Sequence, residues 1–259
     1  MTDYEQVSNL FSGVALTLPR IAAAFVVLPL LSNDDMPATV RNSFFVSLAL
    51  VVLPIAQQIP AAPIQGLPVA ALVLKEIFVG LCIGYAFGLI FWAIGNVGNL
   101  IDTKTGATLA SIVDPLAGHQ TSLTGAFLSR FASWLFLASG GFMVFLETLL
   151  GSYTVWPPNE PLPALHKAGE MYFVGLLDEM MAITLMLAAP ALVVLFLIEI
   201  AFGLVNRYAQ QLNVVSLASS VKTWVSAWIV MLSLGVMVQF VMQKIDAQRT
   251  LLSVLERIL

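Results

Sequence analysis

The sequence predicts an all-α, polytopic, membrane-targeted protein, and two observations carry this prediction. Hydrophobic residues make up 59% of the 259 residues and charged residues only 10%, whereas about a quarter of the residues in a soluble domain are charged. Four runs contain no charged residue, and each is long enough to cross a hydrocarbon core of about 30 Å: 42–74, 77–101, 180–198 and 223–243. No soluble class fits this composition.

Prolines and charged residues divide the chain into about six hydrophobic segments. In order, these segments span roughly residues 11–31, 40–59, 69–101, 127–150, 172–204 and 214–241. Proline removes a helical hydrogen bond, so we expect the first and fifth segments to be proline-broken, at Pro19, Pro29 and Pro190. The third segment is too long for one simple span.

The last residues differ in character from the rest. Apolar and charged side chains alternate there with the spacing of an amphipathic helix, through Leu251, Leu252, Leu255, Ile258 and Leu259 on one side and Asp246, Arg249, Glu256 and Arg257 on the other. We therefore divide the chain into one domain, 1–245, and an amphipathic C-terminal helix, 246–259. This helix is expected either to lie on the membrane surface or to dock onto a partner protein.

Five glycines of the third segment fall on one side of the predicted helix. At 100° per residue, Gly80, Gly84, Gly88, Gly95 and Gly98 lie at about 0, 40, 80, 60 and 0 degrees. We call this set the glycine stripe. A lipid-facing helix would carry bulky side chains there, and small residues instead allow another backbone to approach closely. The glycine stripe therefore predicts a helix that packs inside an assembly.

The distribution of charged residues along the chain differs from that of a simple membrane anchor. Basic residues divide evenly between the two sides of a six-span topology, so they do not indicate an orientation. Charges also fall within or near the apolar segments, at Lys75, Glu76, Glu147, Glu199 and Lys222. Unpaired charge is costly in lipid and is tolerated where protein or a water-filled cavity surrounds the chain. This pattern favours a subunit that is largely buried in a complex.

The sequence contains no recognisable catalytic or cofactor site. Motifs for nucleotide binding, zinc proteases and serine hydrolases are absent. His119 and His166 lack partners at metal-ligand spacing, and Cys82 is the single cysteine, expected to be an inert packing residue. The net charge of −4 comes without a basic cluster, which excludes nucleic acid as a partner. We expect no enzyme activity, no metal and no cofactor.

Two functions from different classes remain. One is a proton- or ion-coupled transporter of small solutes, in which Glu147, Glu199, Lys75 or Lys222 would form a relay. The other is a structural subunit of a protein-conducting gate. Transporters usually contain inverted repeats with interrupted helices at matching positions, and the prolines of this chain do not follow such a pattern. The gate subunit is therefore favoured.

A series of short motifs resembles a known family over about residues 10–245. The first block comprises Phe91-Trp92-Ala93, Gly98-Asn-Leu-Ile-Asp102, Gly106-Ala107, Asp114-Pro115, Ser122, Gly140-Gly141, Ser152-Tyr153 and Trp156-Pro157. The second block comprises residues 206–214, with Lys222 downstream. In order and spacing these motifs resemble the SctT/FliR family of type III secretion export-gate proteins.

The chain departs from the family pattern at two places. Thr103-Lys104-Thr105-Gly106 stands where the family often has Asn-Gln-Arg-Gly, and Val215 stands where many members have phenylalanine. Tyr153 with Trp156-Pro157 is more similar to the injectisome branch, SctT. The flagellar branch, FliR, remains the alternative within the family.

The resemblance implies a function, partners and a location. One copy of such a protein joins five SctR and four SctS subunits in an export gate, with SctU at its base, SctV beneath, and inner rod or needle proteins as further partners. Unfolded proteins pass through the gate, and lipid surrounds part of it. The resemblance places it in the bacterial inner membrane, as a multi-pass protein within the basal body and partly displaced to the periplasmic side.

The segment between the third and fourth hydrophobic segments is the candidate gate. It is over 20 residues long, and loops of this length are uncommon unless they are functional or disordered. Extrapolating the helix puts Asp102 at about 40 degrees, on the glycine side. The resemblance implies that this segment plugs the export channel, through Gly106, Leu109, Ile112, Asp114, Pro115, Gly118 and Ser122. An ordinary surface connection is the alternative.

Overall fold

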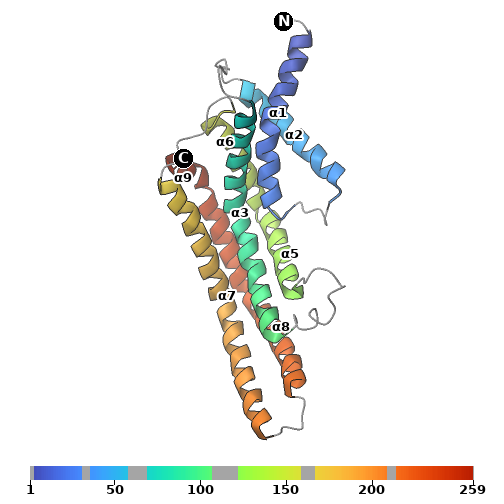
Figure 1. Cartoon of the computed structure of the whole chain (residues 1–259), viewed down its shortest axis with the longest axis vertical. Helices are drawn as coiled ribbons and strands as arrows, with labels where there is room; N and C mark the ends of the chain where they lie inside the picture. Colours follow the sequence, from blue (N-terminus) through green and yellow to red (C-terminus); the bar gives the residue numbers. More distant parts are fainter. Residues whose placement is uncertain are drawn as a thin grey trace. The chain divides into compact units, whose positions relative to one another are not determined.

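The computed structural model describes residues 3–30, 36–57, 69–106, 122–158, 167–208 and 214–258. All regular structure in these residues is helical, which confirms the predicted all-α class (Figure 1). The helices are α1 (Asp3–Val27), α2 (Ala38–Gln57), α3 (Val69–Thr105), α5 (Leu123–Ala138), α6 (Gly141–Val155), α7 (Lys167–Tyr208), α8 (Val214–Gln248) and α9 (Leu251–Ile258).

The chain forms two compact units, each built from separate stretches of sequence. Unit 1 contains Met1–Leu89, Gly140–Leu176 and Ile245–Leu259, and unit 2 contains Ile90–Ser139 and Leu177–Lys244. Helices α3, α7 and α8 therefore each contribute one part to unit 1 and another to unit 2.

Unit 1 has an aromatic core. The ring of Phe25 on α1 lies 5.2 Å from that of Phe45 on α2 and 5.1 Å from that of Phe145 on α6. Phe87 on α3 contacts Phe145 from another side, with ring centroids 5.2 Å apart. The two contacts of Phe145 are edge-to-face, and such pairs add to the stabilisation that buried aromatic surface provides. Four helices therefore converge on one cluster.

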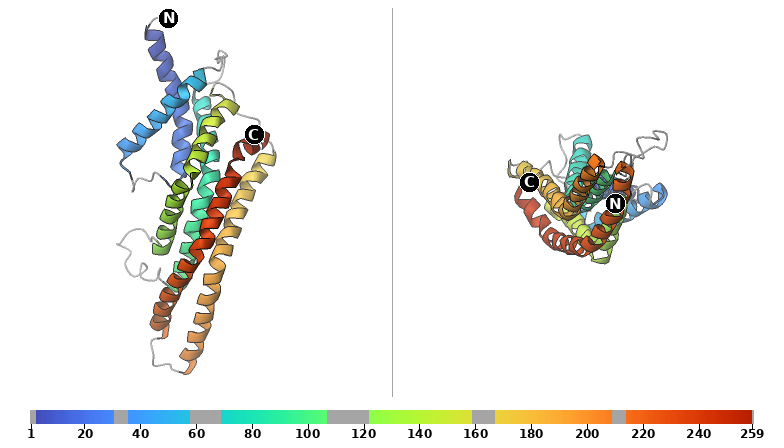
Figure 2. Two further views of the ribbon diagram at one scale, coloured as in Figure 1. Left: turned by 180° about the vertical axis from the view of Figure 1, so that it is seen from behind. Right: turned by 90° about the horizontal axis from the view of Figure 1, so that it is seen from below.

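Unit 2 is held together by contacts of α3 with α5, α7 and α8. Phe91 on α3 packs edge-on against Phe136 on α5, with centroids 5.2 Å apart. The Thr184 hydroxyl of α7 donates to the Ala93 carbonyl at 3.3 Å, and the Ser219 hydroxyl of α8 donates to the Thr105 carbonyl at 3.0 Å. The unit 2 portions of α7 and α8 run side by side, as seen in Figure 1 and in the view from behind in Figure 2.

Several helices are long and apolar enough to cross a membrane. Within the described residues three helices meet this condition, over 70–105, 171–208 and 214–248, and a fourth span results if α5 and α6 are counted together. Shorter apolar stretches lie in α1 and α2. Each long helix extends for more than about 50 Å, whereas a hydrocarbon core is about 30 Å thick. Parts of these helices therefore extend beyond any hydrocarbon core that they cross perpendicularly.

Two of the three predicted proline breaks are replaced by continuous helix. Pro19 lies inside α1 and Pro190 inside α7, whereas Pro29 follows the end of α1. A proline removes one backbone hydrogen bond, but its φ suits a helix, and contacts on both sides can keep the flanking turns in place. In α1 such contacts exist, because the carbonyl of Thr17 and the side chain of Arg20 are both bonded to α6.

One segment that the sequence predicts as continuous, 127–150, is divided into α5 and α6. Gly140 has a φ of +81°, in the left-handed region that favours glycine, and it follows the last turn of α5. The amide of Ser139 still donates to the Leu135 carbonyl at 2.9 Å, which completes the end of α5. The break therefore results from local glycine geometry within an apolar run.

Candidate functional site

The first two glycines of the glycine stripe lie against α1 in unit 1. A Cβ atom on Gly84 would stand 2.5 Å from the Ala24 carbonyl oxygen and 3.0 Å from the Ala24 Cα. A Cβ on Gly80 would collide with the carbonyl of Arg20. Real Cβ atoms do not approach backbone so closely, so α1 and α3 can only meet here through glycine.

The last two glycines lie against α5 in unit 2. A Cβ on Gly98 would stand 2.5 Å from the Cα of Gly125, and one on Gly95 would collide with the Ser129 hydroxyl. Gly125 is itself a glycine, so two backbones are in direct contact at this crossing. Gly88, the middle member of the stripe, is buried. The stripe thus contacts α1 in unit 1 and α5 in unit 2.

Asp102 connects the end of α3 to the beginning of α5. Its Oδ2 accepts hydrogen bonds from the Ser122 hydroxyl at 2.6 Å and the Thr124 amide at 2.9 Å, and its Oδ1 accepts one from the Thr124 hydroxyl at 2.6 Å. Ser122 also caps α5, because its Oγ accepts from the Gly125 amide at 2.8 Å. A carboxylate at a helix N-terminus is further stabilised by the helix dipole. We call Asp102, Ser122 and Thr124 the Asp102 cluster.

The Asp102 cluster lies at the two ends of the segment that the family resemblance implies is a plug. Gly106, which begins it, has a φ of +86°, and Ser122, which ends it, is the cap of α5. The other predicted plug residues lie outside the described residues: Leu109, Ile112, Asp114, Pro115 and Gly118. The Asp102 cluster therefore joins the end of α3 and the start of α5, which flank residues 107–121.

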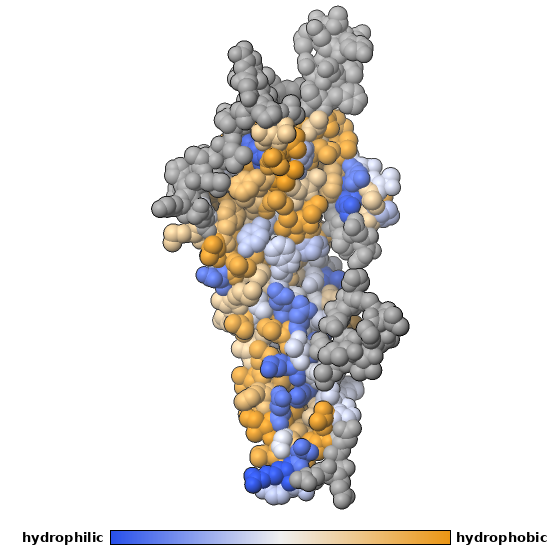
Figure 3. Space-filling view, in the orientation of Figure 1, coloured by the Kyte–Doolittle hydropathy of each residue, from blue (hydrophilic) through white to orange (hydrophobic). Residues whose placement is uncertain are grey.

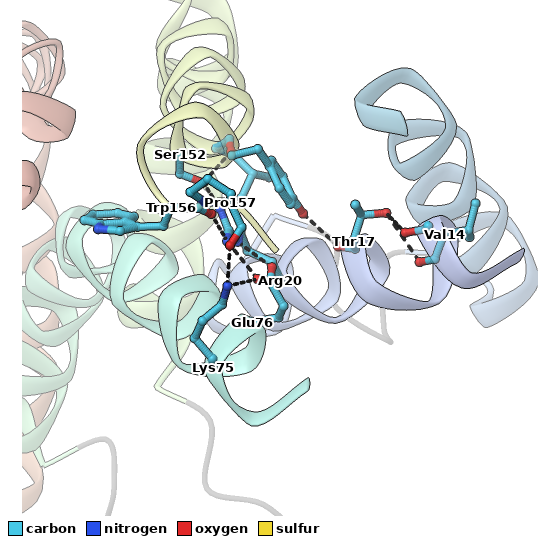
Figure 4. Close-up of polar contacts among 11 residues, drawn as sticks. Val14, Thr17, Arg20, Lys75, Glu76, Ser152, Trp156 and Pro157 are labelled. Atoms are coloured by element: carbon cyan, nitrogen blue, oxygen red, sulfur yellow. Dashed lines mark hydrogen bonds and ion pairs between the residues drawn. The ribbon is translucent and has the colours of Figure 1, made fainter. Parts of the chain in front are cut away.

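A second polar site lies buried in unit 1, where three charged side chains meet (Figure 4). Arg20 donates to both carboxylate oxygens of Glu76, from Nε at 2.7 Å and from Nη2 at 2.9 Å. Lys75 Nζ lies 2.9 Å from Glu76 Oε1. The side chains of Arg20 and Glu76 are 0% exposed and that of Lys75 is 1% exposed. We call these three residues the Arg20 network.

The end of α6 completes the coordination of the two cations. Arg20 donates to the Ser152 hydroxyl at 2.9 Å and to the Trp156 carbonyl at 2.7 Å, and Lys75 donates to the Pro157 carbonyl at 2.6 Å. The C-terminal carbonyls of a helix carry partial negative charge, so they compensate for the cation that Glu76 does not balance. The Arg20 guanidinium also lies 4.1 Å above the Tyr153 ring, a cation–π contact. The network joins α1, α3 and α6.

Sequence reasoning missed the Arg20 network but noted most of its members. In the sequence, Lys75 and Glu76 are charges in an apolar segment, and Ser152, Tyr153 and Trp156 belong to family-like motifs. Nothing in the pattern connects Arg20 to them. The available signal was that charges in different apolar segments must pair when both segments are buried.

The remaining charges in the apolar segments are less buried. Lys222 Nζ lies 3.6 Å from Glu199 Oε2 in unit 2, with side chains 12% and 58% exposed. Lys244 pairs with Glu179 in the same unit. Glu147 is on the exposed side of α6. Among the described residues no group of three or more His, Cys, Asp and Glu side chains could hold a metal ion.

The C-terminal helix contacts its own chain. Leu251 and Leu255 of α9 are buried, and α9 packs against α6 in unit 1. The side chain of Leu252 lies so close to Gly151 that a Cβ there would stand 2.9 Å from it. Part of the apolar side of this helix is therefore covered within the chain.

Comparison with known proteins of similar sequence shows the family of this chain. Residues 11–247 match a family described as bacterial export proteins, family 1. The chain belongs to this family. It is 35% identical over 213 residues to the Yop proteins translocation protein T of Yersinia pestis, which covers 82% of each chain. It is 32% identical over 230 residues to the surface presentation of antigens protein SpaR of Salmonella typhimurium, covering 88% of this chain and 85% of that one.

Another relative of this export protein is the flagellar biosynthetic protein FliR of Bacillus subtilis. The two are 29% identical over 219 residues, which is 84% of each chain. The predicted resemblance to the SctT/FliR family is confirmed. Together with the long apolar helices, this membership makes the chain an inner-membrane export protein and not an enzyme.

Proposed function

We propose that this export protein is a structural and gating subunit of a type III secretion export apparatus. It would form part of the channel through which unfolded effector and needle or rod proteins pass. The higher identity to the translocation protein T than to the flagellar relative, 35% against 29%, supports the injectisome branch.

The proposed partners follow from the family resemblance. One copy of this chain would assemble with five SctR and four SctS subunits and contact SctU, SctV and inner rod or needle proteins. The assembly would stand partly on the periplasmic side of the inner membrane. The exposed apolar surface of α7 and α8 supports assembly, because large apolar surface must be covered by lipid or protein. The division into a domain, 1–245, and a C-terminal helix, 246–259, stays a prediction.

The Asp102 cluster is the observation that carries the gating role. A plug must move when cargo passes, while the frame that holds it must not. Direct backbone contact at Gly98 and Gly125, together with three hydrogen bonds to Asp102, supports such a frame at the ends of 107–121. Displacing this segment would therefore not require α3 and α5 to separate.

Deletion of residues 109–116 tests this role. The shortened chain should still copurify with SctR and SctS, because the Asp102 cluster and the glycine contacts remain. Bacteria that carry it should leak ions and small molecules through assembled complexes, measured as conductance across membrane vesicles. An assembled complex that stays ion-tight would remove this segment from consideration as the gate, whereas loss of copurification would assign it to assembly.

A further inference from the structure

The second half of α3 carries exposed polar side chains next to its contact with α5, where Asn99 Oδ1 lies close to Gly125. Asn99, Thr103 and Lys104 are exposed and Asn96 is half-buried. At 100° per residue, Asn96, Asn99 and Thr103 lie within about 60 degrees of one another. They lie beside the side that meets α5 through Gly95, Gly98 and Asp102. We call Asn96, Asn99 and Thr103 the polar face; Lys104 follows at the end of the helix, about 80 degrees beyond Asn96, and all four residues belong to unit 2.

The polar groups of this face are incompletely bonded within the described part of the chain. Asn99 Nδ2 donates to Asn96 Oδ1 at 3.2 Å, and the Thr103 hydroxyl donates to the Asn99 carbonyl at 2.7 Å. Each amide has two donors and an acceptor oxygen, so one shared bond leaves most of this capacity unused. Lys104 makes no ion pair or hydrogen bond with any described residue.

The surroundings of the polar face are apolar. The exposed side of α7 in the same unit carries Met186 and Phe196, which are 78% and 61% exposed. Figure 3 shows hydrophilic atoms in a band over this part of α3, with hydrophobic atoms of α7 beside them. Amides and an ammonium group are expelled from hydrocarbon, and in membrane proteins they face a protein interior or water.

We propose that the polar face borders a water-filled passage in the assembled export complex. This inference rests on the proposed function, because the passage would be part of the export channel. Water supplies the missing partners of both amides and of Lys104, whereas lipid supplies none. The side chains are neutral amides and a hydroxyl with one cation at the end, and they can hydrogen-bond an extended polypeptide without selecting its sequence.

Thiol labelling distinguishes a face that contacts water from one that lipid or protein covers. Only the thiolate reacts with methanethiosulfonates, and a cysteine in an apolar environment stays protonated. The chain suits this experiment, because Cys82 is its single cysteine and is buried. In a Cys82→Ala background, Asn99→Cys and Thr103→Cys are introduced separately. Met186→Cys, at an exposed apolar position of the same unit, is the matched control.

The labelling is measured on assembled complexes in membrane vesicles with a membrane-impermeant methanethiosulfonate, and read as a mass shift. We expect Asn99→Cys and Thr103→Cys to react about tenfold faster than Met186→Cys, or more. Equally slow reaction at all three positions would overturn the proposal. Fast reaction in the isolated chain but slow reaction in the complex would also overturn it, because a partner subunit then covers the face. The labelling rate measures accessibility to water and does not depend on secretion. A failure of the proposed export function can therefore be told apart from a failure of this inference.

Discussion

Helix α3 and the helices α7 and α8 are similar in length and apolar character, yet α3 is largely covered by its own chain whereas α7 and α8 are largely exposed. The most apolar stretch of α3 is 72% buried within the chain, whereas the corresponding stretches of α7 and α8 are each 22% buried. Trp224 and Leu232 on α8 are 73% and 78% exposed. Apolar composition alone therefore does not tell a helix that the chain itself covers from one that lipid or another protein must cover.

The surroundings of the glycines differ between the buried helix α3 and the exposed helices α7 and α8. At Gly80, Gly84, Gly95 and Gly98 of α3, an added Cβ atom would lie within 3 Å of another part of the chain. At Gly203 of α7 and Gly235 of α8, it would meet nothing within 4 Å. The charges differ in the same way, because Glu76 of α3 is fully buried between two cations and Glu199 of α7 is more than half exposed.

Removing the buried anion should have the largest effect. Glu76→Gln leaves Arg20 and Lys75 buried without a counter-charge. Breaking a buried ion pair costs about 3–5 kcal/mol, so we expect the free energy of unfolding to fall by about that amount. The measurement is chemical denaturation of the purified chain in detergent, read by circular dichroism.

Glu199→Gln is the matched control for this change. The same substitution in a half-exposed pair should cost less than about 1 kcal/mol. Equal losses for the two variants would contradict the difference between α3 and α7. The control also addresses ion coupling: an export complex that carries Glu199→Gln and secretes normally has no obligatory proton relay at this position.

Alanine substitutions of glycine should come next in size, with opposite signs on the two kinds of helix. Gly98→Ala places a methyl group against the backbone of Gly125, and overpacking of this kind costs about 1–3 kcal/mol. Gly203→Ala meets nothing within 4 Å and should stabilise α7 by up to about 1 kcal/mol through helix propensity. Thermal denaturation of the two variants compares them directly. If Gly98→Ala is as stable as the native chain, close packing at this crossing is not required.

The helices were predictable from the sequence, but their interruptions were not. Charge-free runs predict the long helices because a helix satisfies its own backbone in an apolar environment. Gly140 lies inside the hydrophobic segment 127–150, and neither hydropathy nor periodicity indicates that it adopts a left-handed φ. Pro19 and Pro190 conversely predict breaks, yet both lie inside continuous helices, and at Pro19 the hydrogen bonds between α1 and α6 hold the flanking turns. Hydrophobic patterning therefore predicts which helices form, whereas their ends depend on the backbone conformation of single residues such as Gly140 and on tertiary contacts such as those around Pro19.

The polar sites were predictable only in part, for a related reason. Asp102 falls on the glycine side of α3 by simple helical geometry, so its contact with α5 follows from the periodicity. The Arg20 network joins residues more than 50 positions apart, and helical periodicity within one element carries no information about such pairing. Lys75 and Glu76 are recognisable in the sequence as charges in an apolar segment, but their partner Arg20 is not.

Loss of the α5 cap should have the smallest effect and the most local one. Ser122→Ala removes the acceptor for the Gly125 amide and one donor to Asp102, and losing a serine cap costs about 1 kcal/mol. Amide hydrogen exchange at Thr124 and Gly125 should accelerate about fivefold, the factor that corresponds to this energy. Ser133→Ala is the matched control, because the Ser133 hydroxyl bonds only within α5, to the Ser129 carbonyl. If both variants exchange alike at the first turn of α5, the Asp102 cluster does not hold the base of 107–121. Acceleration confined to Ser122→Ala would assign that role to the cap.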